Sequence, residues 1–425
     1  MGARRACLKS QKGELKMKIL IFGGSGKIGS AVAWDLAKDK EVEAIGIAGR
    51  HKETLENIKK WVKSNKIIPH ILDINDKKET VALMKKYDVG AFLLPDRKTS
   101  YKVLHLSVEA GLNSVDALEE FHRTPDPYEI EGLEIPGGLK LEEYGEWLHR
   151  KASENQVIFL DGMGFAPGLS NITCGEGIRK LDVAERVVAR VGGIPSKEAA
   201  AKHPLRYMIT WAFQHVLREY MIKLKVIKNG KIVEVNAATD LEKFVFNQLG
   251  KNEPLECAIT PGMPSFLFTR PDLKEFSEKT VRWPGHWEGI QTLKECGLLD
   301  IEPKDFNGVK IAPREFLSFL ITPKLLPNEG ETDVCVMYNT VEGKKGGRKK
   351  RIEYFMWDEA DRKNGLSSMM RVTGFPVAIA ARWLAKGKIK GKGIVAPEDA
   401  ITGKLYEEFL EELTERNILI KAVSS

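Results

Sequence analysis

The chain of 425 residues lacks long hydrophobic runs, paired cysteines and any cysteine cluster of the zinc-binding type. No apolar run approaches the roughly 18 residues that a membrane-spanning helix needs, so we predict no membrane protein and no membrane partner. The first sixteen residues also lack the apolar stretch of a signal peptide. An odd, sparse set of cysteines without a CxxC pair favours reduced thiols, a cytoplasmic location and no metal site. The cysteines are Cys7, Cys174, Cys257, Cys296 and Cys335.

The net charge of +7 is concentrated in two short basic segments. Residues 343–351, GKKGGRKKR, contain no acid, and residues 1–16 contain Glu14 as their single acid. Outside these segments the chain is mildly acidic, which argues against a nucleic-acid partner. We interpret residues 343–351 as a solvated hairpin loop, and the alternative is a patch for an anionic partner.

The N-terminal part of the chain alternates strand-like apolar runs with helical patterns. In the first unit the run KILIFGG (residues 18–24) precedes Ile28, Val32 and Leu36, which recur at the four-residue spacing of a helix face. Repeated β–α units of this length predict a parallel sheet that is covered on both faces. Further strand-like runs occupy residues 43–49, 66–73, 88–95, 114–116 and 157–162.

A different pattern follows residue 171. Strand-like stretches are joined by turns, among them the hairpin dipeptide Asn229-Gly230, which indicates a mixed or antiparallel sheet in a second domain. A helical pattern resumes at Gly365, with Pro376 permitting a kink. The connection at residues 117–156 is predicted to be a surface loop followed by a helix over residues 141–155, and the alternative is a loop that covers a pocket.

These patterns predict an α/β fold with an N-terminal Rossmann domain and a second domain built on a mixed sheet. We place a disordered extension at residues 1–16 and the Rossmann domain at residues 17–170. A substrate domain covers residues 171–360, and C-terminal helices cover residues 361–425. Exposed edges of a mixed sheet in the second domain also suggest a homodimer.

Residues 24–29, GSGKIG, form a G-x-G-x-x-G run after a strand and at the start of a helix, which is the context of a dinucleotide-binding loop. Gly24 permits the tight turn, Gly26 lets the backbone approach a pyrophosphate, and Gly29 lets helix and strand pack closely. Free amides at the helix N-terminus face the phosphates. The alternative is a glycine turn without a ligand. The predicted contacts of this loop are Gly24, Ser25, Gly26, Lys27, Ile28 and Gly29.

The position that reads the adenosine ribose lies about twenty residues beyond Gly29, and it carries no acid. Gly49 and Arg50 stand there, and Arg50 is suited to pair with a 2′-phosphate through charge-assisted hydrogen bonds. Ser25, Lys27, His51 and Lys52 lie close by in the predicted fold. We therefore predict NADP as the first choice of cofactor and NAD as the alternative. Further candidate cofactor contacts stand at the ends of the next two strands: Asp73, Ile74, Leu94 and Pro95.

Several candidate site residues lie at the carboxyl edge of the predicted sheet, where ligands of α/β proteins bind. Residues 160–171, LDGMGFAPGLSN, form a bend with few side chains, so Gly164 and Asn171 are candidate substrate contacts. Asp116 and Asp161 end parallel strands, where either can hold a substrate ammonium or accept its proton. The alternative for both aspartates is that they cap the following segments.

The bend, together with RVGGIP (residues 190–195), TVRWPGH (280–286) and SSMMRVTGFPVAIAARWLAKGKI (367–389), resembles the saccharopine dehydrogenase family. Within that family the chain is most similar to the lysine 6-dehydrogenase branch. The resemblance implies that the late helices return to the Rossmann half. It also implies hydride transfer between an amine-bearing carbon of an amino acid and NAD(P). In the lysine version the imine is hydrolysed to a semialdehyde, which cyclises to a piperideine carboxylate.

Some positions fit this chemistry. Arg282 and Arg371 are suited to bind a substrate carboxylate, although each can equally form an internal salt bridge. His286 is a candidate general base, with a structural histidine as the alternative. Residues 207–220, YMITWAFQHVLREY, resemble the family's Tyr-x-x-Ser/Thr-Trp-Ser element, which makes Trp211 a candidate substrate contact. Ala212 replaces the polar residue of that element, and the connection at residues 117–156 is longer than expected.

The sequence therefore predicts an NAD(P)-dependent amino-acid oxidoreductase acting on a CH–NH or CH–NH2 group, with oxidation of the lysine side-chain amine as the leading candidate. One alternative is an imine reductase of the saccharopine reductase or carboxynorspermidine synthase type. Another is a non-catalytic NADP-binding sensor, which the Ala212 departure suggests.

Overall fold

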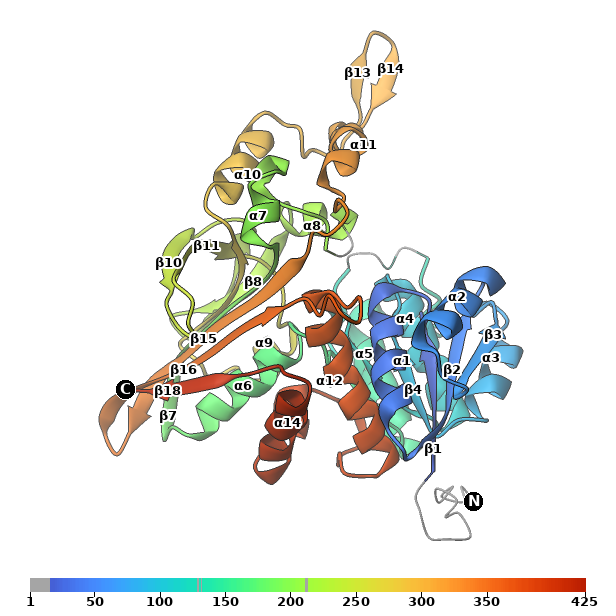
Figure 1. Cartoon of the computed structure of the whole chain (residues 1–425). Coiled ribbons are helices and arrows are strands. Elements are labelled where there is room, and N and C mark those ends of the chain that lie inside the picture. Colours follow the sequence, from blue (N-terminus) through green and yellow to red (C-terminus); the bar gives the residue numbers. More distant parts are fainter. Residues whose placement is uncertain (1–15, 128–129, 131, 211–212) are drawn as a thin grey trace. The chain divides into compact units, whose positions relative to one another are not determined.

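The computed structural model describes residues 16–127, 130, 132–210 and 213–425 (Figure 1). These residues divide into two compact units. The first unit comprises Met1–Ile172, Met263–Ser265 and Met370–Asn417, and the second comprises Thr173–Gly262, Phe266–Met369 and Ile418–Ser425. The predicted extension at residues 1–16 lies, apart from Lys16, outside the described residues.

The first unit contains a seven-stranded parallel sheet in the order β17-β6-β5-β4-β1-β2-β3. The central strand β1 is buried along nearly its whole length, as expected for a parallel strand covered on both faces. The predicted Rossmann arrangement is therefore confirmed. The strands are β1 (Met17–Phe22), β2 (Val42–Gly49), β3 (Ile67–Ile71), β4 (Val89–Phe92), β5 (Asn113–Asp116), β6 (Ile158–Leu160) and β17 (Gly393–Val395).

Helices pack on both faces of this sheet. The core cluster on one face joins residues of α3, α4 and α5, including Met84, Leu104 and Leu148. Helix α12 packs closely against α1. A side chain added at Gly374 of α12 would come within 2.9 Å of the Ala31 side chain of α1. The helices of this unit are α1 (Lys27–Lys38), α2 (Lys52–Val62), α3 (Lys77–Met84), α4 (Arg97–Ala110), α5 (Leu141–Glu154), α13 (Pro397–Ala400) and α14 (Lys404–Glu415).

Three helices cross the division between the units: α6 (Leu169–Arg179), α9 (Ser265–Thr269) and α12 (Ser368–Ala385). Helix α12 continues through Pro376, which the sequence only identified as a possible kink. Strand β17 was not predicted, because residues 393–395 are too few to show a strand periodicity. The same holds for the short strand β18 of the second unit.

The second unit contains a nine-stranded mixed sheet, as predicted. Its longest hairpin joins β15 to β16, and the basic segment at residues 343–351 lies at the tip, with the turn at Gly346 and Gly347. The strands are β7 (Val183–Pro195), β8 (Lys223–Lys228), β9 (Lys231–Asn236), β10 (Glu242–Phe246), β11 (Glu253–Ile259), β12 (Glu275–Arg282), β15 (Asp333–Lys345), β16 (Arg348–Glu359) and β18 (Lys421–Ser424).

The remaining elements of the second unit are short helices and one separate hairpin. The hairpin pairs β13 (Lys304–Phe306) with β14 (Val309–Ile311). The helices are α7 (Lys197–Ala200), the 3-10 helix η1 (Pro204–Arg206), α8 (Phe213–Glu219), α10 (His286–Glu295) and α11 (Pro313–Leu325). Within the described residues, no helix combines the length and the apolar character that crossing a bilayer requires.

Candidate functional site

The glycine loop after β1 has the shape of a phosphate cradle. A side chain at Gly29 would come within 2.3 Å of the Gly23 carbonyl oxygen, and one at Gly24 within 2.8 Å of Ile47. Gly26, which is exposed, would meet the Gly23 carbonyl oxygen at 3.3 Å and nothing else within 4 Å. Gly24 and Gly29 therefore keep helix and strand together, whereas Gly26 leaves open the space in front of α1.

Helix α1 offers its N-terminal amides to a ligand. Its N-cap residue, Gly26, makes no side-chain capping bond, and its first turn contains no acidic residue. Unsatisfied amides at a helix N-terminus attract anions, so the loop fits the pyrophosphate of a dinucleotide. The predicted loop residues Ser25 and Lys27 are exposed on this side, and Ile28 is half-buried.

Arg50 stands at the end of β2, next to the glycine loop. A side chain at Gly49 would lie 3.7 Å from the hydroxyl oxygen of Ser25, so the end of β2 and the loop are neighbours. Arg50, His51 and Lys52 are exposed. Arg50 forms no hydrogen bond or ion pair with any residue that the structure describes. An uncommitted guanidinium beside a phosphate loop fits a 2′-phosphate.

The remaining predicted cofactor residues lie at the carboxyl ends of the neighbouring strands. Asp73 and Ile74 follow β3, and the carboxylate of Asp73 accepts the backbone N–H of Asn75 at 2.9 Å. Leu94 and Pro95 follow β4, and Leu94 packs partly against the core of the first unit. All four therefore share the sheet edge with the glycine loop, and their contact with a cofactor stays a prediction.

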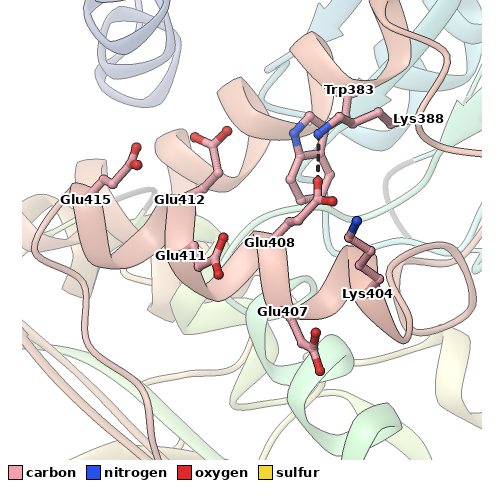
Figure 2. Close-up of a pocket in the computed structure, with 8 residues that line it drawn as sticks. All are labelled: Trp383, Lys388, Lys404, Glu407, Glu408, Glu411, Glu412 and Glu415. Carbon is pink, nitrogen blue, oxygen red and sulfur yellow. Dashed lines mark hydrogen bonds and ion pairs between the residues drawn. The ribbon is translucent and has the colours of Figure 1, made fainter.

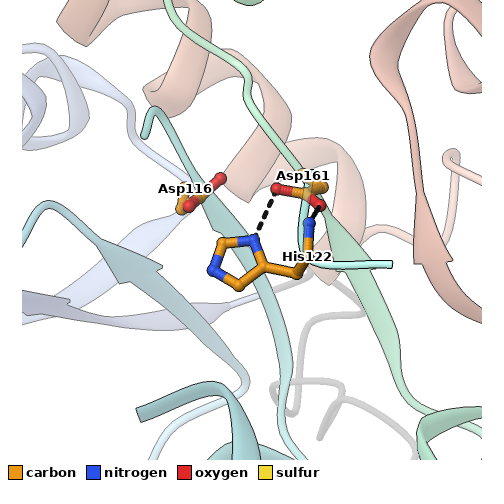
Figure 3. Close-up of side chains that lie close together, drawn as sticks. All are labelled: Asp116, His122 and Asp161. Carbon is orange, nitrogen blue, oxygen red and sulfur yellow. Dashed lines mark hydrogen bonds and ion pairs between the residues drawn. The ribbon is translucent and has the colours of Figure 1, made fainter. Parts of the chain in front are cut away.

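Asp116 and Asp161 meet at the carboxyl ends of β5 and β6, together with His122 (Figure 3). Asp161 accepts the backbone N–H of His122 at 2.7 Å, and its other oxygen lies 2.9 Å from the Nδ1 atom of His122. Asp116 accepts the backbone N–H of Gly162 at 2.7 Å through Oδ1. Its Oδ2 atom is buried and has no hydrogen-bond partner among the residues that the structure describes. We refer to Asp116, His122 and Asp161 as the acid cluster.

The acid cluster is buried, and burial determines its protonation. Burial, followed by the neighbouring charge of Asp161, raises the pKa of Asp116 well above its ordinary value. Burial also raises the pKa of Asp161. The pKa of His122 is lowered by burial, which keeps the ring neutral. In the tautomer that carries its hydrogen on Nδ1, His122 donates to Asp161, and its Nε2 atom accepts from the Ser100 hydroxyl at 3.0 Å.

The loop after β5 is anchored beside the acid cluster. Glu120 accepts the Tyr101 hydroxyl at 2.7 Å and pairs with Arg97 at 2.9 Å. Burial raises the pKa of Glu120 to about 7 even though Arg97 opposes that shift. The first part of the connection, predicted to be a surface loop, is therefore buried at Glu120, Phe121 and His122.

Asn171, a predicted substrate contact, belongs to another buried group in the first unit. Its amide nitrogen lies 2.9 Å from the Ser265 hydroxyl and 3.1 Å from the Glu398 carboxylate. Its carbonyl oxygen accepts the backbone N–H of Gly168 at 3.0 Å. Asn171 thus fixes the bend that contains Gly164, a buried position where a side chain would come within 3.1 Å of Thr373.

Arg282 and His286 lie together in the core of the second unit. The Nη2 atom of Arg282 donates to the Tyr220 hydroxyl at 2.9 Å, and its guanidinium lies 5.3 Å from the Tyr207 ring. Burial and the charge of Arg282 lower the pKa of His286 to about 3. The Nδ1 atom of His286 lies 2.9 Å from the Leu205 carbonyl oxygen. This environment favours a structural role for His286 over a general base near neutral pH.

Arg371, another predicted substrate contact, is bonded to main-chain carbonyl oxygens. The Nη2 atom of Arg371 donates to the carbonyl oxygens of Arg416 at 3.1 Å and Asn417 at 3.2 Å, just beyond the end of α14. Arginine at such a position satisfies carbonyls that the helix leaves free. Trp211 lies, with Ala212, outside the described residues.

A hollow of about 440 Å³ on the first unit contains none of the predicted site residues (Figure 2). Its walls come from α12, α14 and the segment between them, and Lys388 pairs with Glu408 at 2.6 Å across it. The lining residues are Trp383, Lys388, Lys404, Glu407, Glu408, Glu411, Glu412 and Glu415. Acidic side chains interspersed with lysines are typical of a solvated helix face, so we assign no ligand here.

The sequence did not single out Ser100, Glu120, His122, Ser265 or Glu398. Four of them stand in segments without a motif, and Ser100 is one of many polar residues in a helix. Their association depends on the ends of β5, β6 and β17 meeting at one edge. Which residues come together is therefore determined by the order of the strands in the sheet, and residue spacing along the sequence does not reveal it.

The first unit therefore defines a dinucleotide-binding protein of the Rossmann class. Comparison with known proteins identifies the group to which it belongs. Residues 19–157 match the saccharopine dehydrogenase NADP-binding domain, and residues 164–419 match the saccharopine dehydrogenase C-terminal domain. The chain belongs to the saccharopine dehydrogenase family, and it is an NADP-dependent oxidoreductase.

Individual relatives are distant but match along most of the chain. Carboxyaminopropylagmatine dehydrogenase of Synechocystis is 22% identical over 90% of this chain and 92% of its own length. An NADP-dependent, L-glutamate-forming saccharopine dehydrogenase of Schizosaccharomyces pombe is 21% identical over 93% of this chain and 97% of its own. The apo, L-glutamate-forming saccharopine dehydrogenase of Saccharomyces cerevisiae shares the fold, with a TM-score of 0.76, 19% identity and coverage of 96% and 100%.

Proposed function

We propose that this protein transfers a hydride between NADP and the amine-bearing carbon of an amino acid or of an amino-acid conjugate. The observation that carries the proposal is that the glycine loop, Arg50 and the acid cluster lie at one edge of one parallel sheet. Ligands of such sheets bind at that edge. The cofactor supplies the hydride acceptor or donor, and the chain supplies binding, orientation and proton transfer.

In the oxidative direction a CH–NH group loses a hydride from carbon and a proton from nitrogen, which leaves a C=N bond. Water then adds to the imine carbon, the C–N bond breaks, and a carbonyl compound and an amine are released. The reductive direction reverses these steps. Asp116 is our candidate for the proton transfer, because its Oδ2 atom has no hydrogen-bond partner within the described part of the chain and its raised pKa favours the neutral acid.

Two substrate classes fit the proposal. The names of the two relatives favour a secondary amine, in which an amino acid is joined to a second molecule. The resemblance to the lysine 6-dehydrogenase branch favours the side-chain amine of lysine. We propose the secondary amine as the first candidate, because those relatives match the chain over nearly its full length, and lysine as the second.

A purified-enzyme assay tests the proposal. Nicotinamide absorbance is followed with oxidised NADP and NAD for amino acids including lysine and for saccharopine-type conjugates. The reduced forms of both cofactors are used for pairs of an amine with a carbonyl compound. We expect turnover with NADP in the conjugate or amine–carbonyl sets. Turnover with lysine alone selects the second candidate. Cofactor binding without turnover in any set contradicts the enzymatic proposal and favours the sensor.

A further inference from the structure

The sheet order indicates which half of a bound dinucleotide lies over the acid cluster. The glycine loop follows β1, and Arg50 follows β2 on one side of it. The adenosine half of a dinucleotide therefore extends over β2 and β3, and the nicotinamide half extends over β4, β5 and β6. Asp116 ends β5, and Asp161 follows β6 one residue beyond the paired residues Val115 and Leu160. The acid cluster lies on the nicotinamide side.

The acid cluster contains more acid than base. Asp116 and Asp161 form no ion pair with a lysine or arginine among the described residues, and His122 is held neutral. The surrounding elements add Ser100, Tyr101 and Arg97 from α4, Glu120 from the loop, and Glu398 from α13. Arg97 is already bonded to Glu120 at 2.9 Å and also faces Asp126 at 3.7 Å.

The acid cluster can change its charge by gaining or losing a proton at the Oδ2 atom of Asp116. Its Oδ1 atom accepts the backbone N–H of Gly162, whereas Oδ2 is buried and bonds to none of the described residues. A proton on Asp116 avoids placing a second carboxylate charge beside Asp161. A positive charge arriving at the same sheet edge lowers the cost of that second charge.

Only the oxidised cofactor brings a positive charge to this sheet edge, because its nicotinamide ring is cationic and the reduced ring is neutral. We propose that binding of the oxidised cofactor is coupled to the release of a proton from the Asp116–His122–Asp161 cluster to solvent, whereas binding of the reduced cofactor is not. The inference rests on the proposed function. It adds that the acid cluster makes the preference for the oxidised cofactor depend on pH.

Linkage gives the size of the effect. If one whole proton is released, the affinity for the oxidised cofactor rises by about tenfold per pH unit across the titration range of the acid cluster. The oxidised and reduced cofactors carry the same 2′-phosphate and contact the same glycine loop. Any pH dependence of these contacts therefore cancels in the ratio of the two affinities. We expect that ratio to change by roughly three- to tenfold per pH unit.

Isothermal titration calorimetry of the full chain tests the proposal without catalytic turnover. NADP+ and NADPH are titrated between pH 6.5 and 8.5 in buffers that differ in ionisation enthalpy, which reports the protons released on binding. We expect proton release with NADP+ that exceeds the release with NADPH, and an NADP+/NADPH affinity ratio that rises with pH. Equal proton release for both forms at every pH overturns the proposal.

Variants identify the source of the proton. Asp116→Asn keeps the shape and the acceptor for Gly162 but removes the titrating group, so we expect the excess proton release to disappear. Glu142→Gln, on the exposed first turn of α5, is the control and is expected to behave as wild type. Unchanged excess release in Asp116→Asn contradicts the assignment. If that variant does not fold, the wild-type comparison still decides, and absence of binding of either cofactor contradicts the proposed function instead.

Discussion

At the scale of single residues, Arg50 determines our expectation for the cofactor. It replaces the acid that reads a free ribose hydroxyl, and it has no partner among the described residues. Arg50→Ala should weaken NADP binding by about tenfold to a hundredfold and leave NAD binding nearly unchanged, since one charge-assisted contact contributes about 1.5–3 kcal/mol. Fluorescence titration with both cofactors measures the change. Lys60→Ala, on the exposed side of α2, is the control. An unchanged NADP affinity in Arg50→Ala would contradict the assignment of Arg50 to the 2′-phosphate.

Two glycines of the same loop should respond differently to alanine. Gly26→Ala adds a methyl group that approaches the Gly23 carbonyl oxygen at 3.3 Å, so the fold should survive with a drop in melting temperature of a few degrees. Cofactor affinity should fall by at least about tenfold, because the pyrophosphate needs that space.

Gly29→Ala adds a methyl group only 2.3 Å from the same oxygen, so it should impair folding instead. Calorimetry and cofactor titration of both variants separate the two effects. Gly137→Ala, in an open loop, is the control. Full cofactor affinity in Gly26→Ala would place the phosphates elsewhere.

The sequence placed the glycine loop and Arg50 side by side, but it did not bring together the residues of the acid cluster; the cofactor contacts of the loop stay a prediction. The glycine run and its distance to Arg50 are local, so counting along the chain found them. Asp116 and Asp161 were candidates because each ends a strand, but their partner His122 was not. Its position follows from a loop without periodicity, which turns back onto β6.

At the scale of elements, buried ion pairs fasten the C-terminal helices to α1. Arg416 binds Asp35 through two nitrogen–oxygen contacts of 2.9 Å, and Arg382 binds Asp39 at 2.8 Å and Glu412 at 2.5 Å. The return of the late helices to the Rossmann half was implied by the family resemblance. Composition and periodicity did not predict it, because the pairs with Asp35 and Asp39 join residues more than 340 positions apart.

We expect Asp35→Ala to destabilise the protein by about 3 kcal/mol, because it removes the buried carboxylate bound to Nε and Nη2 of Arg416 and leaves that guanidinium with Glu412 at 2.8 Å. Chemical denaturation measures the change. Lys77→Ala removes the exposed pair with Glu134 and serves as the control, with an expected loss below about 1 kcal/mol. A loss in Asp35→Ala as small as in the control contradicts the role of this pair.

Elements defined by long periodic segments were predicted well, and the short strands β5 and β6 were predicted as members of the β–α series. The helix over residues 141–155 corresponds to α5, and the hairpin around the basic segment corresponds to β15 and β16. Strands β17 and β18, of three and four residues, lie outside that series and were not predicted. They form because β6 and β16 offer unpaired edges.

At the scale of the whole molecule, the buried carboxylates predict how stability depends on pH. Folding raises the pKa of Glu120 from 4.5 to about 7, so the folded state binds more protons than the unfolded state between these values. Stability should therefore fall as pH rises from about 4.5 to about 7, and Asp116 and Asp161 act in the same direction.

Denaturation midpoints of the wild type and of Glu120→Gln across this range test that expectation. The variant should show a weaker fall of stability between these pH values. Parallel curves for the two proteins contradict the assignment of the effect to Glu120.

The homodimer also stays a prediction at this scale. Strands β10 and β18 lie at the edges of the path through the nine-stranded sheet, which leaves backbone groups available for pairing. Sedimentation of the purified chain should give twice the monomer mass of 47.6 kDa. Sedimentation as a monomer at micromolar concentration contradicts the prediction.

The central claim is that the chain moves a hydride between NADP and an amine-bearing carbon. The most direct measurement uses NADPH labelled with deuterium at the reactive carbon, incubated with the protein and with amino acids paired with carbonyl compounds. Mass spectrometry of the products should reveal a new C–N compound that carries one deuterium on the carbon bound to nitrogen. Oxidation of the cofactor without deuterium in any C–N product, or no oxidation at all in a protein that binds NADPH, would contradict the account.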